Sequence, residues 1–177
     1  MPVSVSFWFD PATDARVRAV WRELAEAGIS SYMHECGFRP HITLVAFEDS
    51  DPASLLQVLR DRAGAVRALP LELYFLGQFL SPVETIFLAP IVTAPMLSLR
   101  AAIVEVLAHA GRSPAGSQYD ADRWVPHATL GTEMSAAQLS AAFEVCRKMP
   151  LPLTARVDRL GLVDYATVVE IGEIPLL

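Results

Sequence analysis

The sequence predicts a two-lobed protein of the α/β class, of the α+β type, with internal pseudo-twofold symmetry. Strand-like and helix-like segments alternate along all 177 residues, and their order repeats in the second half. A five-residue pattern, Pro-His-x-Thr-Leu, occurs once in each half, at residues 40–44 and 126–130. We therefore expect one domain over residues 1–177, made of approximate repeats 1–90 and 84–177.

The first half begins with an alternating segment at residues 3–9, which predicts a strand. Asp10 and Pro11 then supply an N-cap and a proline at the first helical position, and the helix is expected to end at Gly28. Residues 29–38 fit no clear pattern. The remaining expected elements are a strand at 41–47, a helix after Asp51-Pro52, and strands at 69–79 and 84–89.

The second half is expected to follow the same order. A helix at about 95–110 precedes a polar loop at 112–124, and loops of this length in compact domains are often functional. Ser135 and Gln138 form a capping box for a further helix. Strands are expected at 127–131, 151–163 and 165–171, and the Leu-Pro-Leu sequence of residues 69–71 returns at 151–153.

The composition limits the kinds of partner. Hydrophobic residues make up 53% of the chain and charged residues 19%, which provides for a packed core. A net charge of −6 argues against extended duplex nucleic acid, which needs a broad basic face, but a small anionic substrate needs only a local cleft. Cys36 and Cys146 fit no disulfide framework, and neither a signal peptide nor a membrane-spanning run is visible. We expect a cytoplasmic monomer without membrane contact.

The repeated motif places polar and apolar side chains on opposite faces of a strand. Because strand side chains alternate, His41 and Thr43 share one face, and so do His127 and Thr129. The residues between and after them are apolar and anchor each strand in the core. If the halves are related by a pseudo-twofold axis, two imidazoles and two hydroxyls converge on one site.

This set of side chains suits a phosphodiester. Histidine titrates near neutral pH, so one ring can act as a base while the other acts as an acid. The threonine hydroxyls can donate hydrogen bonds to the non-bridging phosphate oxygens. The scheme requires no metal and no cofactor. A single histidine on a half-buried strand is usually a hydrogen-bonded core residue, and a duplicated unit can preserve a packing motif by descent. The recurrence of the same context favours the catalytic interpretation.

Two H-x-T-hydrophobic motifs in a chain of this length resemble the 2H phosphoesterase superfamily, which includes the 2′-5′ RNA ligase-like proteins and the cyclic phosphodiesterases. The resemblance implies two antiparallel sheets that line a central cleft, with helices outside. It also implies metal-free cleavage of 2′,3′-cyclic or related phosphodiesters of nucleotides or RNA ends. The catalytic residues would be His41 and His127, and Thr43 and Thr129 would hold the phosphate. The acidic charge disfavours ligation of large structured RNA.

Four further residues are candidates for substrate binding. Tyr119 and Arg123 lie in the loop before the second motif, where an aromatic ring can stack on a base and an arginine can neutralise phosphate. Arg39 precedes His41 by two residues, so it can share that face or extend into solvent. Phe7 of the first strand lines the cleft or fills the core.

The sequence gives little support to a metal site and leaves three other functions open. His34 and Cys36 form an H-x-C pair, but no second pair has suitable spacing, so no metal site is predicted. Three alternatives share the motif residues: joining or cleavage of 2′-5′ RNA linkages, a module that binds a nucleotide phosphate without turnover, and a duplicated scaffold without a ligand.

Overall fold

The computed structural model describes residues 1–63, 66–80, 83–109 and 114–177. Residues 110–113, which include the expected end of one helix and the start of the 112–124 loop, lie outside the described residues. The first half of the chain contains β1 (Val3–Phe9), α1 (Pro11–Glu26), α2 (Tyr32–Glu35), β2 (His41–Phe47), α3 (Pro52–Ala63) and β3 (Leu69–Phe79). The second half contains β4 (Glu84–Pro90), α4 (Ala94–His109), the 3-10 turn η1 (Ser117–Tyr119), β5 (Ala128–Met134), α5 (Ala136–Cys146), β6 (Leu153–Asp164) and β7 (Val169–Pro175).

Local sequence explains where the helices begin. The Asp10 carboxylate accepts hydrogen bonds from the backbone N–H groups of Ala12 and Thr13 at the start of α1. Ser135 and Gln138 form the predicted capping box of α5. The segment without a clear pattern, 29–38, contains the short helix α2. No helix within the described ranges is both long and apolar enough to cross a bilayer.

The strands form one hydrogen-bonded sheet, in the order β2-β1-β6-β3-β4-β5, with β7 also paired to β6. The α+β fold class and the antiparallel pairing are confirmed, but the prediction of two separate sheets is not. The reason is that β3 and β6 pair with each other and join the two sets of strands. This long-range pairing exchanges strands between the halves, because β6 lies beside β1 and β3 lies beside β4.

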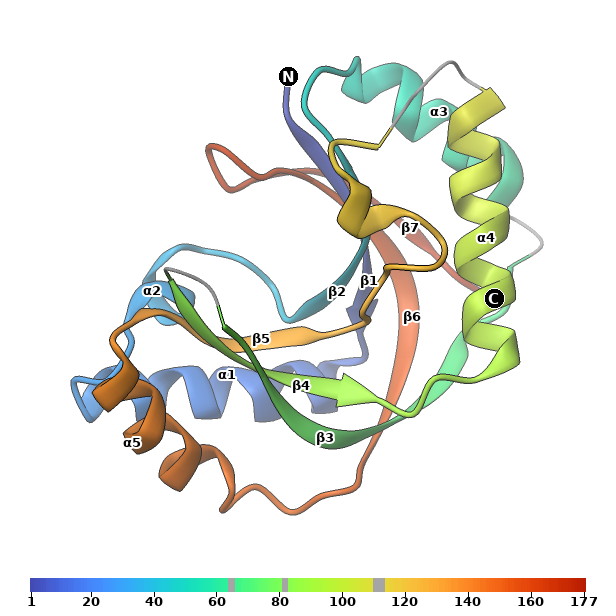
Figure 1. The fold of residues 1–177 in the computed structure, drawn as a ribbon. Coiled ribbons are helices and arrows are strands. Elements are labelled where there is room, and N and C mark those ends of the chain that lie inside the picture. The colour runs from blue at the N-terminus through green and yellow to red at the C-terminus, as the bar shows by residue number, and fades with distance from the viewer. Residues whose placement is uncertain (64–65, 81–82, 110–113) are drawn as a thin grey trace.

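The sheet is staggered and strongly curved. The two sets of strands overlap only where residues 69–73 pair with residues 153–157. Beyond that overlap, β6 continues beside β1 and β7, while β3 continues beside β4. The sheet curls so that its two outermost strands, β2 and β5, approach each other (Figure 1). The division into repeats 1–90 and 84–177 stays a prediction. If β1, β2 and β3 are matched with β4, β5 and β6, the strand order is the same from either end of the sheet.

Two pairs of helices cover the outside of the curved sheet (Figure 1). Helices α3 and α4 pack against each other, and α1 packs against α5. The buried residues of the strands and helices form one continuous hydrophobic core, from Val3 in β1 to Ile174 in β7. The concave side, where β2 and β5 meet, is therefore left for a site.

Candidate active site

The two motif strands carry a β-bulge at the same motif position. The register of the β1–β2 ladder shifts so that Leu44 is an extra residue, and the register of the β4–β5 ladder shifts in the same way at Leu130. Both leucine side chains are buried in the core. A bulge bends its strand and changes the direction of the neighbouring side chains, and bulges are frequent beside active sites. The motif therefore encodes a bent strand end as well as two polar residues.

Cross-strand pairing determines which face each motif residue occupies. Residues directly opposite in an antiparallel ladder place their side chains on the same face. His41 lies opposite Trp8, and Thr43 lies opposite Ser6. Across the site, Thr129 lies opposite Phe87. The concave face of β1 is thus the one that carries Ser6 and Trp8.

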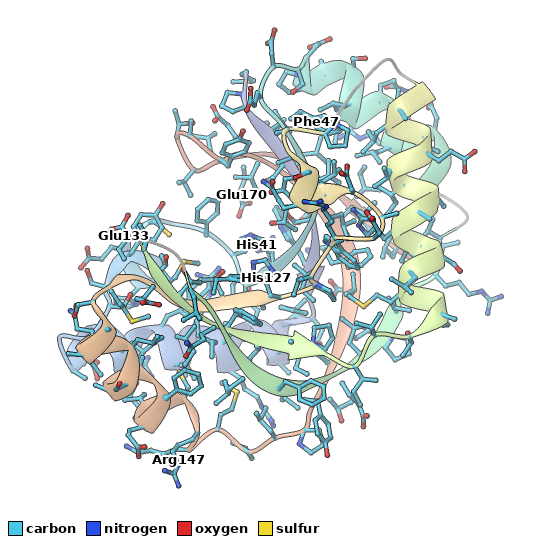
Figure 2. All side chains as sticks on the ribbon, in the orientation of Figure 1. His41, Phe47, His127, Glu133, Arg147 and Glu170 are labelled. Atoms are coloured by element: carbon cyan, nitrogen blue, oxygen red, sulfur yellow. The ribbon has the colours of Figure 1, made fainter. Side chains whose placement is uncertain are left out.

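A cavity of about 570 Å³ contains all four motif side chains. His41 and Thr43 line it from β2. Thr129 lines it from β5, and His127 lines it from the position directly before β5. The two histidines lie close together at the centre of the molecule (Figure 2). The volume is within the range of about 300–1,000 Å³ that is typical of small-molecule sites. The convergence predicted from the repeated motif is therefore present.

Each imidazole makes the same hydrogen bond, to the backbone carbonyl two residues before it in the chain. Nδ1 of His41 contacts the carbonyl oxygen of Arg39 at 2.6 Å, and Nδ1 of His127 contacts that of Val125 at 2.7 Å. A carbonyl oxygen only accepts, so Nδ1 is the donor in both rings. In the neutral rings Nε2 is then unprotonated. Both histidines are oriented in the tautomer that leaves Nε2 free to take up or release a proton.

The surroundings favour neutral imidazoles. Burial lowers the pKa of His41 below its ordinary value, and a charge on His127 lowers it further, although the bond to Arg39 opposes both effects. Burial also lowers the pKa of His127, against the bond to Val125. The His127 ring lies 4.8 Å from the Phe79 ring and 5.3 Å from the Phe87 ring, between centroids. Because two positive charges repel each other, a proton on one imidazole disfavours a proton on the other.

Comparison with known families agrees with this geometry. A family model described as the 2′-5′ RNA ligase superfamily matches residues 6–168, a range that includes both motifs and extends from within β1 through β6. The chain belongs to the 2′-5′ RNA ligase superfamily. A search of curated protein sequences found no match.

Several solved structures share the fold of nearly the whole chain. Escherichia coli LigT in complex with 3′-AMP is 17% identical, with a TM-score of 0.61, and the alignment covers 99% of each chain. TT0787 of Thermus thermophilus is 14% identical, with a TM-score of 0.61, and Kluyveromyces marxianus Usb1 is 12% identical, with a TM-score of 0.59. Each alignment covers 99% of this chain and 98% of the other. At these identities the likeness shows the fold alone.

Two of the four residues predicted to bind substrate lie at the site. Tyr119, in η1, lines the main cavity. It also lines an adjoining cavity of about 380 Å³, together with Trp124 and the exposed Arg123. The two cavities share Thr43 and His127, so the adjoining one is a side arm of the site. The structure thus places Tyr119 inside the cavity and Arg123 at the edge of its side arm.

Two other candidates do not line the cavity. Phe7 is completely buried in the core, opposite Ile42, because it occupies the convex face of β1. Arg39 forms an ion pair with Glu173 at 3.2 Å, and its guanidinium lies 4.5 Å from the centre of the Trp8 ring. The positive charge of Arg39 is therefore compensated by Glu173, outside the cavity lining. The interpretation of Phe7 and Arg39 as substrate-binding residues is not supported by these positions.

Several cavity residues were missed by the sequence reasoning. Ser4 lines the cavity because it lies on the same face of β1 as Ser6. Thr85 and Thr132 line it together, and their hydroxyls are 2.9 Å apart. The alternation of β1 held a signal for Ser4, since the concave face is the one opposite Phe7. The other missed lining residues, which lie outside the motifs, include Tyr32, Phe38, Glu48, Phe79, Gln118 and Tyr165.

Proposed function

We propose that this protein is a phosphoesterase that hydrolyses a 2′,3′-cyclic or related phosphodiester of a nucleotide or an RNA end. The observation that supports the proposal is the shared orientation of His41 and His127. Both rings donate through Nδ1 to the backbone carbonyl two residues earlier in the chain, which leaves Nε2 free, and both residues line one cavity. The side chains of Thr43 and Thr129 line the same cavity. Two proton-transfer groups and two hydrogen-bond donors are what this hydrolysis requires.

In the proposed reaction, one histidine takes a proton from water while the water oxygen forms a bond to phosphorus. The bond from phosphorus to one ribose oxygen breaks, and the other histidine donates its Nε2 proton to that oxygen. Thr43 and Thr129 donate hydrogen bonds to the non-bridging oxygens as negative charge accumulates there. Among the described residues, no group of three His, Cys, Asp or Glu side chains is placed to hold a metal ion. The metal-free scheme stays a prediction.

We assign His41 as the base and His127 as the acid. Burial lowers the pKa of both imidazoles, and repulsion between two charged rings acts on both, so the pair holds one proton more readily than two. With that proton on His127, His41 keeps a free lone pair. Titratable groups whose environments separate their pKa values commonly divide the acid and base roles in this way. The protonated His127 also supplies one positive charge to the site.

The cavity favours a substrate with a single negative charge. Of its described lining residues none is a lysine or arginine, and Glu48 is the one carboxylate. A phosphodiester carries one charge, which the protonated His127 can balance. A terminal phosphomonoester or a polyphosphate carries more charge than this site offers to neutralise. Aromatic rings suited to stacking on a base complete the wall: Tyr32, Phe38, Phe79, Tyr119 and Tyr165.

The proposal is tested by incubating the protein with the four 2′,3′-cyclic mononucleotides and following the products by phosphorus NMR. We expect conversion to a phosphomonoester in the wild type and its loss in His41→Asn and His127→Asn. Binding of an intact ligand without turnover would instead support a non-catalytic module. That two structural neighbours were solved with 3′-AMP and uridine monophosphate supports a nucleotide substrate here.

RNA joining at the same site is the second candidate, favoured by the family description and by the likeness to LigT. Joining replaces water with the 5′-hydroxyl of a second RNA strand, so it uses the same two histidines. RNA halves that carry a cyclic phosphate and a 5′-hydroxyl distinguish the reactions, because only joining yields a longer strand. The net charge of −6 favours hydrolysis, since extended RNA contacts need a basic surface.

A further inference from the structure

The backbone carbonyl of each motif threonine accepts a hydrogen bond from a tryptophan in the other half of the chain. Nε1 of Trp124 donates to the carbonyl oxygen of Thr43 at 2.9 Å. Nε1 of Trp21 donates to the carbonyl oxygen of Thr129, also at 2.9 Å. Trp21 lies on α1 and Trp124 lies in the segment before β5. The two bonds are reciprocal, because each half of the chain supplies the tryptophan that contacts the motif strand of the other.

These carbonyls need a partner for two structural reasons. β2 and β5 are the outermost strands of the sheet order, so one edge of each has no neighbouring strand. Each threonine also directly precedes the bulge residue, Leu44 or Leu130, where the ladder is interrupted. A carbonyl that is partly shielded from water and has no partner costs free energy, and the indole N–H groups satisfy both carbonyls. The bonds therefore lie at the point where each motif strand is least fixed by the sheet.

Arginine side chains hold both indoles in place. The guanidinium of Arg100, on α4, lies 4.5 Å from the centre of the Trp124 ring. Arg100 is only 5% exposed, and its Nε donates to the carbonyl oxygen of Leu44 at 3.3 Å. It also donates to the carbonyl oxygen of Tyr119. On the other side, the guanidinium of Arg18 lies 5.6 Å from the centre of the Trp21 ring. The bulge of β2 is thus fixed at two successive carbonyls.

We propose that Trp21 and Trp124 are positioning residues that set the separation of the two catalytic imidazoles. Each histidine precedes its threonine by two residues in the chain, at or directly before the start of the motif strand, and its Nδ1 is bonded to the backbone of the segment that leads into that strand. A shift of the strand at the threonine therefore carries the imidazole with it. The catalytic consequence rests on the proposed function, whereas the structural coupling does not.

The first test replaces the indole by a ring without an N–H donor. Trp21→Phe and Trp124→Phe should each lower kcat on a 2′,3′-cyclic nucleotide at least tenfold, because a misplacement of 1 Å can cost about 10²-fold in rate. For Trp21→Phe, KM should change less than about twofold, since this indole lines neither the main cavity nor its side arm. Thr13→Val is the matched control. It removes the 2.7 Å bond from the buried Thr13 hydroxyl to Asp10, at the start of α1, and should leave kcat unchanged.

A second readout needs no substrate. Proton titrations of the two imidazoles by nitrogen-15 NMR should respond reciprocally to the substitutions. Trp124→Phe should shift the pKa of His41 more than that of His127, because Trp124 contacts the His41 strand. Trp21→Phe should show the opposite pattern. A merely structural loss would not divide its effects between the histidines in this way.

The outcomes separate the two proposals. Folded variants with wild-type kcat and unchanged imidazole titrations would overturn the positioning role. If Trp21→Phe does not fold, benzothienylalanine at position 21 keeps the ring volume, lacks the donor, and should produce the same effects. If the wild type turns over none of the phosphodiesters, the proposed function fails, and the reciprocal titration shifts still decide the positioning role.

Discussion

Replacing His127 with asparagine tests the assignment of acid and base most directly. The substitution removes the Nε2 proton donor and keeps an amide that can donate to the Val125 carbonyl. A general acid contributes about 10²–10⁴-fold, which is about 3–5 kcal/mol of transition-state stabilisation. We expect kcat/KM on a 2′,3′-cyclic nucleotide to fall within that range. His34→Asn is the control, because His34 is an exposed histidine that does not line the cavity.

The pH profile adds a signed prediction. The base must be neutral and the acid must be protonated, so kcat/KM should peak between the two pKa values. Both pKa values are lowered by burial, so the peak should lie below about pH 6.5. His127→Asn should lose the decline on the alkaline side, and His41→Asn the decline on the acidic side. The opposite pattern would reverse the roles. Rates within tenfold of wild type in both variants would refute acid–base catalysis by this pair.

Three further outcomes are expected. Thr43→Val and Thr129→Val should each lower kcat about 10²-fold, with partial recovery in the serine variants, because serine restores the hydroxyl donor. Glu48→Gln should raise kcat/KM a few-fold for a cyclic nucleotide that carries a 5′-phosphate, but not for one without it; the gain should vanish at high salt, since it comes from removed charge repulsion. In urea unfolding, the wild type should lose stability as the pH falls through about 6.5. The unfolded state then binds protons that the partly buried imidazoles of His41 and His127 resist, because their pKa values are lowered in the folded state. The double variant His41→Asn/His127→Asn should lose less stability.

Much of the fold could be predicted because its elements are locally specified. The alternation of residues 3–9, the Asp10-Pro11 cap and the Ser135–Gln138 capping box each mark an element at the position where the structure has it. The strand pairing was harder to predict. Nothing local indicates that β3 pairs with β6, since the paired residues, from Leu69–Val157 to Leu73–Leu153, are at least 80 positions apart in the chain.

The site could be predicted only as far as the alternation of each strand holds. His41 and Thr43 lie on one face as expected, but the bulge at Leu44 then changes the phase. Simple alternation would continue the concave face at Val45, whereas the structure places Ala46 and Glu48 in the cavity. A bulge depends on both strands of a ladder, so one strand read alone does not show it. The hydrogen bonds from Trp21 to Thr129 and from Trp124 to Thr43 could not be predicted either, because each joins residues that are far apart in the sequence.

The exchange of β3 and β6 between the halves has a consequence for synthesis on the ribosome. A nascent chain that ends near residue 90 already carries His41 but lacks β6, the inner neighbour of β1. The sheet around the first motif strand, β2, is therefore complete only after residues 153–164, which form β6, have been synthesised. We expect the two halves, expressed as separate fragments, to be inactive alone and to regain structure only when mixed. Because each half contributes a strand to the other, neither half is expected to fold on its own.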